Sequence, residues 1–506
     1  MRQLAPEFTP YAWAPPRDEV APLAGIDESQ VLRFDQNTPA LPLPSSRPGA
    51  IAGALARISS YPGGGYRRLR RAIADYAGVE PENIVLGAGA DDLILLCARA
   101  YAGPGDAIAI PAAPTYPLYR IAAQLAGACV GGRDPVLTFA CRPNNPTGEL
   151  LPLPDGGPLV VDEAYFEYCG ATAVGGEAIV LRTFSKLHGL AGARVGYAIA
   201  PREVADELNA RQAPAPVSSL GAELAIAALA ARPDPAPAIE ERERLASALR
   251  TLGLRPLESH TNFLYVPVED GVELGERLLR QGIVVRAYAE AIRASVRDAT
   301  DDDLLVEALA RLLDRPSPVV PAGGRRARTL RATAETRLAV RLALDGASRV
   351  RVDTGAGLYD HFLEQLAFHA GFDLVLEGAG DLETGEHHTA EDTALAFGAA
   401  LDEALGDRRG IARYGDAVVP MDDALARAAV DLGGRPNAEL KLENDPGLAE
   451  HMLASLAQSA RASLHVTATG RDAHHTAEAA FKAVGRALRA AVRRESDGLP
   501  STKGLL

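Results

Sequence analysis

The pentapeptide HHTAE occurs twice in the last third of the chain, at residues 387–391 and 474–478. Each copy opens a run with helical patterning, and a strand-like run precedes it, DLVLEG before the first copy and SLHVTATG before the second. An identical motif in two similar settings indicates an internal duplication. We therefore expect residues 325–506 to form a duplicated α+β unit, with two sheets and their helices folded on the same plan.

The histidines of this region have the chemistry and spacing of metal ligands. Ten histidines are present in the chain, and eight of them lie between His361 and His475. On a helix, the first histidine and the glutamate of HHTAE are four residues apart and share a face. The second histidine is rotated by about 100° from the first, so each copy divides its histidines between two ions. Imidazole with carboxylate suits manganese, iron, cobalt or zinc, and the spacing does not choose among them.

Several ordered blocks carry a resemblance to a known family. They include DTGAGLYDHFLEQLAFHAGFDL, GEHHTAEDTALAFGAAL, DAHHTAEAAFKAV and the tail LPSTKGLL. Over residues 325–506 the chain resembles imidazoleglycerol-phosphate dehydratase. The resemblance implies a duplicated α/β unit, two manganese ions in each active site, and subunits that form trimers and then 24-subunit shells.

The resemblance also implies two sets of metal ligands and a phosphate site. One ion is held by His387, His465, His474 and Glu478, and the other by His361, His388, Glu391 and His475. His451 matches His361 in its place within the repeat but is not a ligand in the family pattern. The substrate phosphate is met by Arg413, Arg435, Ser501 and Lys503, and His369 and Glu335 lie near the substrate. The candidates for proton transfer are Glu391, Glu478 and Glu335, and the sequence leaves open which of them acts.

A boundary is expected in the Pro-, Gly- and Arg-rich stretch 314–328, which follows the amphipathic helical pattern DDLLVEALARLL. We place the first unit at residues 1–320. Its helical runs, such as YRRLRRAIADYAG, alternate with short apolar strands, such as DAIAIPAAP and GPLVVDEAY. This alternation favours an α/β fold with a mostly parallel sheet.

Four signals in the first unit are the parts of a pyridoxal-phosphate site. Lys186 follows Ser185, Asn145 lies in the turn PNNPTG, and Asp162 ends an apolar strand. GAGADD at 87–92 is a strand–glycine–helix junction, whose N–H groups can receive a phosphate. In such a site a lysine forms the Schiff base and an aspartate pairs with the pyridinium nitrogen.

The ordered set resembles the fold-type-I aminotransferases, and among them histidinol-phosphate aminotransferase, which implies a mostly parallel sheet with helices and a small C-terminal subdomain. The resemblance implies that Lys186 is the Schiff-base lysine, that Asp162 pairs with the pyridinium, and that Arg293 binds the anionic group of the substrate. The remaining cofactor contacts that it implies are Ala90, Asp91, Tyr116, Asn145, Tyr165, Ser185 and Arg194, with Tyr61 reaching in from a partner subunit. Two departures affect the substrate side: the early segment is reduced to QNTPA (36–40), and the connection between PNNPTG and VDEAY is short.

Charge and composition limit the other classes of function. The formal net charge of -14 argues against non-specific binding to nucleic acid or to an anionic membrane. The N-terminus lacks the pattern of a signal peptide, no long apolar stretch predicts a membrane span, and the four cysteines form no CxxC pair. We expect a cytoplasmic protein with reduced thiols.

Together the two resemblances predict a bifunctional enzyme of histidine biosynthesis. The dehydratase makes imidazole-acetol phosphate, and the aminotransferase consumes it with glutamate as the amino donor. Aminotransferase dimers could then sit on the two-fold axes of a 24-subunit shell. Two alternatives stay open for the first unit: another pyridoxal-phosphate enzyme, such as a decarboxylase or an aromatic aminotransferase, or an inactive scaffold.

Overall fold

The computed structural model describes residues 8–26, 28, 31–39, 55, 58–319, 325–333, 335–346, 348–382, 385–495 and 498–500. Contacts divide the chain into two compact units, Met1–Pro318 and Val319–Leu506. The division falls inside the stretch 314–328 in which the sequence predicts a boundary. Among the described residues, no helix has the length and apolar character needed to cross a membrane.

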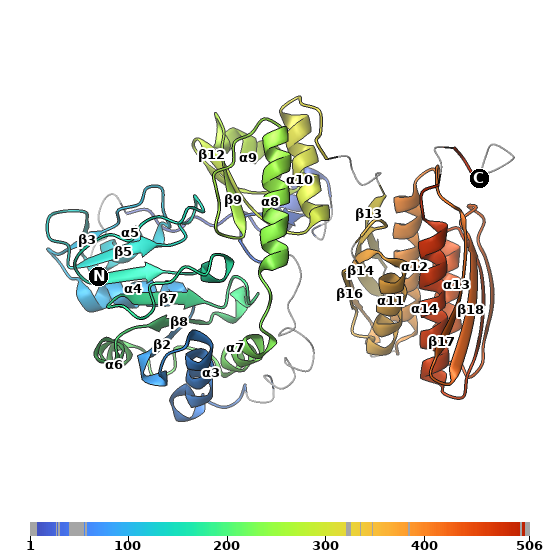
Figure 1. The fold of residues 1–506 in the computed structure, drawn as a ribbon, viewed down its shortest axis with the longest axis horizontal. Coiled ribbons are helices and arrows are strands. Elements are labelled where there is room, and N and C mark those ends of the chain that lie inside the picture. Colours follow the sequence, from blue (N-terminus) through green and yellow to red (C-terminus); the bar gives the residue numbers. More distant parts are fainter. Residues whose placement is uncertain are drawn as a thin grey trace. The chain divides into compact units, whose positions relative to one another are not determined.

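The first unit is built on a seven-stranded sheet with the order β2-β8-β7-β6-β5-β3-β4, shown in Figure 1. The strands are β2 (Ile84–Gly87), β3 (Ala107–Ala109), β4 (Cys129–Val130), β5 (Leu137–Cys141), β6 (Leu159–Asp162), β7 (Ile179–Thr183) and β8 (Gly196–Ile199). Strand β8 is antiparallel to both of its neighbours, and the other pairs are parallel. The sheet is therefore mixed but mostly parallel.

Helices cover both faces of this sheet. They are α3 (Arg67–Ala77), α4 (Ala90–Tyr101), α5 (Leu118–Ala126), α6 (Arg202–Arg211) and α7 (Ser219–Ala231). Leu181 of β7 belongs to an apolar cluster with α4, α5 and α6, whereas its neighbour Val180 belongs to one with α3 and α7. Because successive strand residues point to opposite faces, the two clusters lie on opposite sides of the sheet. This explains why β5 and β7 are buried along their whole length. No helix lies between β5 and β6, as the short connection predicts.

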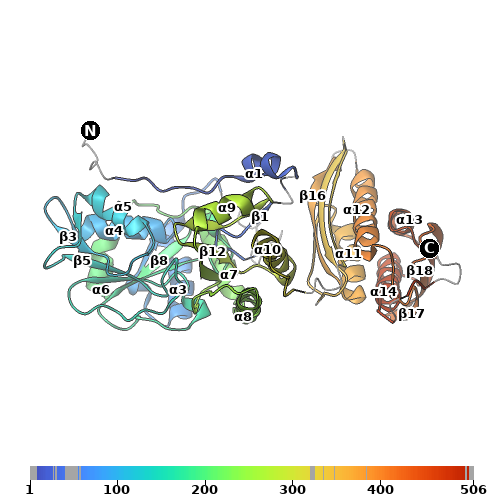
Figure 2. The ribbon, with the colours of Figure 1, turned by 90° about the horizontal axis from the view of Figure 1, so that it is seen from above.

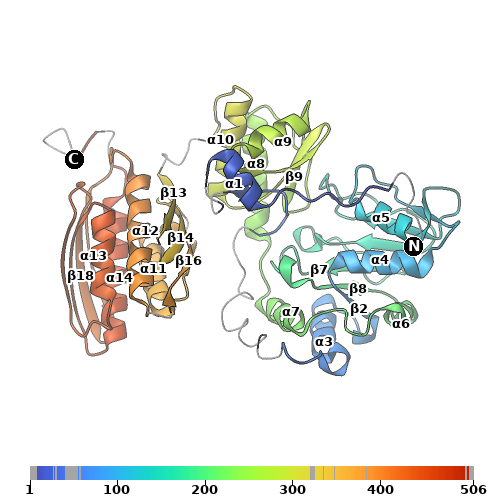
Figure 3. The ribbon, with the colours of Figure 1, turned by 180° about the vertical axis from the view of Figure 1, so that it is seen from behind.

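A smaller subdomain completes the first unit. Its sheet has the order β11-β12-β9, from Arg286–Tyr288, Ala291–Ser295 and Phe263–Pro267, and its helices are α8 (Ala236–Thr251), α9 (Gly271–Leu279) and α10 (Ala299–Leu312). The N-terminal segment joins it, since β1 (Leu32–Arg33) pairs with β10 (Ile283–Val284) and α1 (Arg17–Ala24) contacts α9. Figure 3 shows α1 beside these helices.

The second unit consists of two halves with the same order of elements. The first half contains β13 (Arg326–Ala332), β14 (Thr336–Ala343), β15 (Val350–Asp353), α11 (Gly357–Ala370), β16 (Asp373–Gly380) and α12 (His387–Leu405). The second contains β17 (Tyr414–Met421), β18 (Ala424–Asp431), β19 (Asn437–Leu442), α13 (Ala449–Ser459), β20 (Ser463–Thr469) and α14 (Ala473–Ala491). The strand orders also correspond, β13-β14-β16-β15 and β17-β18-β20-β19.

The four helices lie between the two sheets, as Figure 2 shows, and share one apolar core with them. Each helix packs against a helix of the other half, α11 against α14 and α12 against α13. A glycine at the same place in each HHTAE helix allows this approach. A Cβ atom on Gly485 would collide with the carbonyl of Leu366, and one on Gly398 with the carbonyl of Leu456. The halves are therefore interlocked rather than stacked as separate lobes.

Candidate active sites

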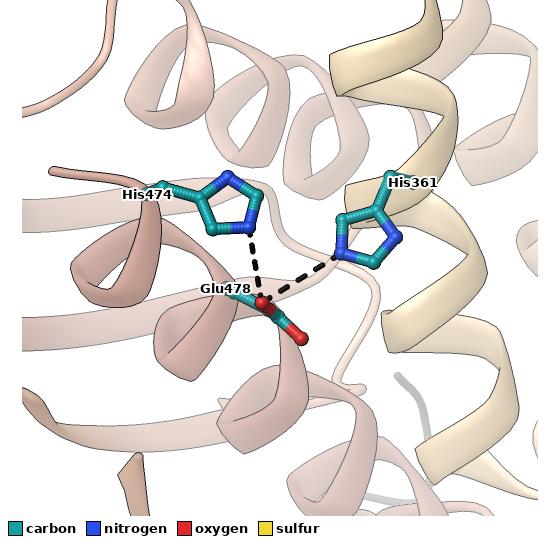
Figure 4. Close-up of side chains that lie close together, drawn as sticks. All are labelled: His361, His474 and Glu478. Atoms are coloured by element: carbon teal, nitrogen blue, oxygen red, sulfur yellow. Dashed lines mark ion pairs between the residues drawn. The ribbon is translucent and has the colours of Figure 1, made fainter. Parts of the chain in front are cut away.

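A cluster of two histidines and a glutamate lies where the N-terminal ends of α11 and α14 meet (Figure 4). The Oε2 atom of Glu478 lies 3.7 Å from Nε2 of His361 and 3.3 Å from Nε2 of His474. The two imidazole rings are stacked, with centroids 5.7 Å apart. All three ligand atoms lie within 4.8 Å of one another. This donor set suits manganese, iron, cobalt or zinc.

A second cluster repeats this geometry at α12 and α13. The Oε2 atom of Glu391 lies 3.6 Å from Nε2 of His387 and 3.4 Å from Nε2 of His451. The rings of these two histidines are also stacked, with centroids 5.0 Å apart. Each cluster thus takes a His–Glu pair from one half and a single histidine from the other half.

The grouping of ligands differs from the one expected from the family resemblance. The structure pairs His474 and Glu478 with His361, and it pairs His387 with Glu391 and His451. His465 does not join either cluster within the chain. It lies on β20 between the buried residues Leu464 and Val466, on the exposed face of the sheet that points away from the helices. Within one chain, the histidine from the other half that lies beside His387 and Glu391 is His451, and the ligand role of His465 stays a prediction.

The second histidine of each HHTAE copy pairs with carboxylates outside these two clusters, and His388 forms with Asp381 and Glu335 a third group whose ligand atoms lie within 4.8 Å of one another. His388 Nδ1 lies 3.1 Å from Asp381 and 3.8 Å from Glu335, and His475 Nδ1 lies 2.8 Å from Asp423. The hydrogen bond to its carboxylate raises the pKa of each imidazole. Such a bond at Nδ1 also fixes the ring and leaves Nε2 to face a ligand.

The predicted phosphate contacts are only partly described. Arg413 donates to both oxygens of Asp431 and to the carbonyl of Pro500, at 2.9 Å for the latter. This bond brings the start of the C-terminal tail to Arg413, while Ser501 and Lys503 lie outside the described residues. Arg435 is exposed just before β19.

His369 lies on α11 beyond His361, facing α14. Burial, together with the nearby charges of Lys482 and Arg486, lowers the pKa of its imidazole. Lys482 itself was not singled out from the sequence. Its Nζ lies 2.8 Å from Oε1 of Glu478, and the spacing of four residues on a helix is the signal that could have found it.

In the first unit, Lys186 and Asp162 meet at the carboxyl edge of the sheet, where ligands bind in open α/β folds. Lys186 lies just after β7, with its Nζ 5.5 Å from the ring centre of Tyr165 and 3.3 Å from the carbonyl of Gln36. Burial, and then the charge of Arg293, lowers the pKa of Lys186 to about 8.

Asp162 is the last residue of β6 and is buried. Its carboxylate accepts hydrogen bonds from the hydroxyl of Tyr119 at 2.7 Å and from the backbone N–H of Ala164 at 3.1 Å. Burial nevertheless raises the pKa of Asp162 to about 6, because these two bonds offset only part of the desolvation. A buried carboxylate of this kind is suited to pair with a cation such as a pyridinium nitrogen.

The junction before α4 forms a cradle of backbone atoms. Gly89 has a φ of 86°, and a Cβ atom there would come within 2.7 Å of Nη2 of Arg194. A Cβ atom on Gly196 would come within 2.6 Å of the backbone of Gly89. The N–H groups of Ala90 and Asp91 begin the helix beside the guanidinium of Arg194, so the junction has the donors that a phosphate requires.

The other predicted cofactor residues surround this cradle. The hydroxyl of Tyr116 donates to Asp91 at 3.0 Å, and Asp91 also pairs with Arg194 at 3.0 Å. Ser185 is buried, with its hydroxyl 3.0 Å from that of Thr183. Tyr61 is 91% exposed, and its predicted role in a partner subunit stays a prediction.

The substrate side is lined by an arginine and two amides. Arg293 donates to Oδ1 of Asn145 at 2.6 Å, and Nδ2 of Asn37 donates to the hydroxyl of Tyr165 at 2.9 Å. Asn37 and Tyr119 were not singled out from the sequence. Asn37 belongs to the segment QNTPA, and Tyr119 belongs to the run PTYPLY that also holds Tyr116. The sequence motifs therefore identified the segments that contain these two residues, but not the residues themselves.

Comparisons with known proteins agree with this division into two sites. The class I and II aminotransferase family matches residues 29–131 and 132–312, together more than half of the chain. The crystal structure of histidinol-phosphate aminotransferase from Sinorhizobium meliloti in complex with pyridoxal-5'-phosphate is similar, with a TM-score of 0.54 at 25% sequence identity. The match covers 61% of this chain and 98% of that one.

The imidazoleglycerol-phosphate dehydratase family matches residues 354–488. The imidazoleglycerol-phosphate dehydratase of Frankia casuarinae is 51% identical over 193 residues, which cover 36% of this chain and 99% of that protein. The dehydratase of Salinispora tropica is 48% identical over 204 residues, with the same coverage. The chain therefore belongs to two families, the class I and II aminotransferases through its first unit and the imidazoleglycerol-phosphate dehydratases through its second.

Proposed function

We propose that the chain catalyses two consecutive steps of histidine biosynthesis. The second unit removes water from imidazoleglycerol phosphate to give imidazole-acetol phosphate. The first unit transfers an amino group from glutamate to that product and gives histidinol phosphate. The observation that carries the first half of the proposal is the pair of matching His–Glu–His clusters, together with the close similarity to known dehydratases.

The two clusters are suited to hold two divalent ions, and we expect manganese. His361, His474 and Glu478 hold one ion, and His387, Glu391 and His451 hold the other, in place of the sets that the resemblance implied. Bound ions supply Lewis acidity that favours the deprotonated imidazole ring of the substrate. The correspondence between the halves supports a duplicated origin for the unit.

His388 and His475 are suited to ligate ions of neighbouring subunits. Their Nδ1 atoms are occupied by Asp381 and Asp423, so Nε2 is the nitrogen left to bind a metal. We therefore propose that active sites form between subunits, in the trimers and 24-subunit shells that the family resemblance implies. Aminotransferase dimers on the two-fold axes of such a shell, and a cytoplasmic location, stay predictions from the sequence.

Glu335 is the best placed of the three proton-transfer candidates. Glu391 and Glu478 each lie in the middle of a cluster, where a bound ion engages the carboxylate. Glu335 is exposed and lies outside both clusters, 3.8 Å from His388. A carboxylate outside the two matching clusters stays available to move a proton at the substrate carbon.

In the first unit, the residues fit pyridoxal 5'-phosphate. Lys186 holds the cofactor, Asp162 faces its ring nitrogen, and the α4 junction with Arg194 receives its phosphate. The bound cofactor supplies an electron sink at the substrate α-carbon. The amine of Lys186 has a pKa of about 8, so it is suited to move the α-proton near neutral pH. Arg293 binds the anionic group of the substrate.

One experiment tests both halves. Purified chain is given imidazoleglycerol phosphate, manganese and glutamate, and histidinol phosphate is measured. The variant Lys186→Ala should stop at imidazole-acetol phosphate, and His451→Ala should block the first step. If wild-type protein accumulates imidazole-acetol phosphate without consuming it, the second half of the proposal is wrong.

The alternatives for the first unit predict different results. A decarboxylase or an aromatic aminotransferase would act on an amino acid or on phenylpyruvate in preference to imidazole-acetol phosphate. An inactive scaffold would show no visible absorbance band from bound cofactor. A band that is lost in Lys186→Ala would exclude the scaffold.

A further inference from the structure

The C-terminal ends of α11 and α14 line a cavity of about 830 Å³ that is open to solvent on one side. This is within the size range of pockets that bind small molecules. Among the described residues, four arginines and one histidine line it, together with one carboxylate, that of Asp345. The five basic residues are Arg325, His369, Arg486, Arg489 and Arg493. The cavity is therefore strongly positive in a chain whose net charge is negative.

Three of the arginines form one row along the end of α14, with Arg486 and Arg489 on the helix and Arg493 two residues beyond its last residue, Ala491. Arg486, Arg489 and Arg493 are three and four residues apart, the spacing that places side chains on one helical face. Arg493 pairs with Glu495, but within the described parts of the chain neither Arg486 nor Arg489 makes an ion pair. Like charges in such a row repel one another, and a bound anion would relieve the repulsion.

Arg325 forms a fixed wall of the cavity. It is 6% exposed, pairs with both oxygens of Asp345 and donates to the carbonyl of Val492. Asp345 is thereby neutralised by Arg325, so it does not compensate the charges of Arg486 and Arg489. One side of the cavity is therefore formed by Arg325, whose hydrogen bonds are made, and the other by Arg486 and Arg489, whose charges are unpaired among the described residues.

An aromatic ring lies at the edge of the cavity. Phe368 is 55% exposed, and its ring lies 5.4 Å from that of His369 in an edge-to-face arrangement. An exposed aromatic face next to arginines is suited to stack on a planar heterocycle while the guanidinium groups bind a phosphate.

We propose that this cavity is a second binding site, for a small phosphate ester that carries a flat heterocycle. The phosphate binds Arg486 and Arg489, and the heterocycle lies against Phe368. The substrates and products proposed above belong to this chemical class, so the identity of the natural ligand rests on the proposed function. The existence of the anion site does not.

The cavity is separate from the metal clusters of the same chain. At a rise of ~1.5 Å per residue, the stretch of α14 from His474 to Arg489 is ~22 Å long. The three-carbon chain between imidazole and phosphate in the proposed substrate is much shorter than this. One molecule cannot reach both the His474 cluster and Arg489.

Stabilisation of the helix end explains only part of the arrangement. Arginines near a helix C-terminus interact favourably with its dipole, and this accounts for Arg489 and Arg493. It does not account for Arg486, which lies before the last turn, nor for a cavity walled on its other side by Arg325.

Binding of inorganic phosphate to the manganese- and cofactor-loaded full chain tests the site. Calorimetry on wild type should show one more class of phosphate sites per chain than on the variant R486A/R489A. Arg461→Ala, which removes an exposed arginine elsewhere in the same unit, serves as the matched control and should bind like wild type. Dehydratase turnover and particle size should be unchanged in all three proteins.

Histidinol phosphate serves as the probe for the heterocycle. Phe368→Ala should weaken its binding to this site about 10-fold, as loss of an aromatic stack predicts, and leave inorganic phosphate binding unchanged. Equal effects on both probes would overturn the stacking contact.

Three outcomes would overturn the site. Unchanged phosphate binding in R486A/R489A would show that the arginines bind no anion. A smaller particle with unchanged phosphate binding would show that the cavity is an interface between copies of the chain. Parallel loss of phosphate binding and dehydratase turnover would show that it is the catalytic phosphate subsite of a neighbouring subunit. Phosphate binding in a chain that makes no histidinol phosphate would instead reject the proposed function and keep the site.

Discussion

The hydroxyl of Tyr119 donates a hydrogen bond of 2.7 Å to Oδ2 of Asp162, and both side chains are buried. The ring of Tyr119 is held in turn by stacking on Phe139, with centroids 5.2 Å apart. Because Asp162 is the last residue of β6 and Tyr119 belongs to α5, this bond fixes the carboxylate between a strand and a helix. It opposes the desolvation that raises the pKa of Asp162.

Tyr119→Phe should therefore weaken the pairing between Asp162 and the cofactor ring. A hydrogen bond to a charged group contributes about 1.5–3 kcal/mol, so we expect the dissociation constant of pyridoxal 5'-phosphate to rise by ~10–100-fold. The pH at which the absorbance band of bound cofactor changes should also move, which a purely structural role would not cause. Tyr101→Phe, in the neighbouring helix α4, is the control. An unchanged band and unchanged affinity in Tyr119→Phe would refute the positioning role.

The rate at which apoprotein takes up the cofactor should depend on pH through Lys186. Only the neutral amine attacks an aldehyde, and the pKa of Lys186 is lowered to about 8. The rate constant should rise about 10-fold per pH unit below 8 and level off above it. Stopped-flow absorbance measures this profile.

The same pKa gives the sign of the stability change. Since the lysine has a lower pKa in the folded chain than its ordinary 10.5, the folded state binds fewer protons between pH 8 and 10.5. The contribution of Lys186 therefore destabilises apoprotein below pH 8 and diminishes as the pH rises through this window. Arg293→Ala removes a cation that lowers the pKa and should shift the uptake profile to higher pH, whereas the exposed Arg280→Ala should not. A profile that is flat from pH 6.5 to 9 would contradict the assignment.

Metal content should separate His451 from His465. His451→Ala should weaken binding at the His387–Glu391 cluster by more than the ~10–100-fold that follows loss of an outer-shell partner, so that about one of two manganese ions is lost after dialysis. His465→Ala should retain both ions in the same assay, because its side chain lies on the other face of the sheet. His361→Ala should behave like His451→Ala. Loss of an ion in His465→Ala, with retention in His451→Ala, would restore the ligand sets that the resemblance implied.

The sequence was sufficient to predict each motif, but not to predict which residues of different motifs contact one another. The two HHTAE copies and the helices they begin followed from local spacing, and Lys186 and Asp162 followed from their strand ends. The ligand role of His465 rested on the family resemblance and stays a prediction, whereas within one chain the side chain near His387 and Glu391 is that of His451. The internal repeat pointed to this place for His451. His451 precedes Leu456 by the same interval that separates His361 from Leu366, and both leucines contact the matching glycines.

Other residues depend on distances that sequence spacing does not report. Tyr119 and Asp162 come together only because α5 packs against the face of the sheet where β6 ends. A helical pattern in the sequence shows the row of Arg486, Arg489 and Arg493. The opposite wall of the cavity is formed by Arg325, which lies about 160 residues earlier, at the start of the second unit.

The matching glycines give a test of the interlocked packing itself. Gly485→Ala and Gly398→Ala should each destabilise the second unit, because the added Cβ meets a backbone carbonyl of the facing helix, which cannot rotate away. Overpacking of this kind costs about 1–3 kcal/mol, which should lower the thermal midpoint of the second unit and loosen its metal clusters. Gly357→Ala is the matched control, since a Cβ atom there meets nothing within 4 Å. If Gly485→Ala and Gly398→Ala have the same thermal midpoint as Gly357→Ala and keep both ions, the close packing of α11 on α14 and of α12 on α13 is refuted. Equal effects of the two substitutions would show that the two interfaces are equivalent in energy as well as in geometry.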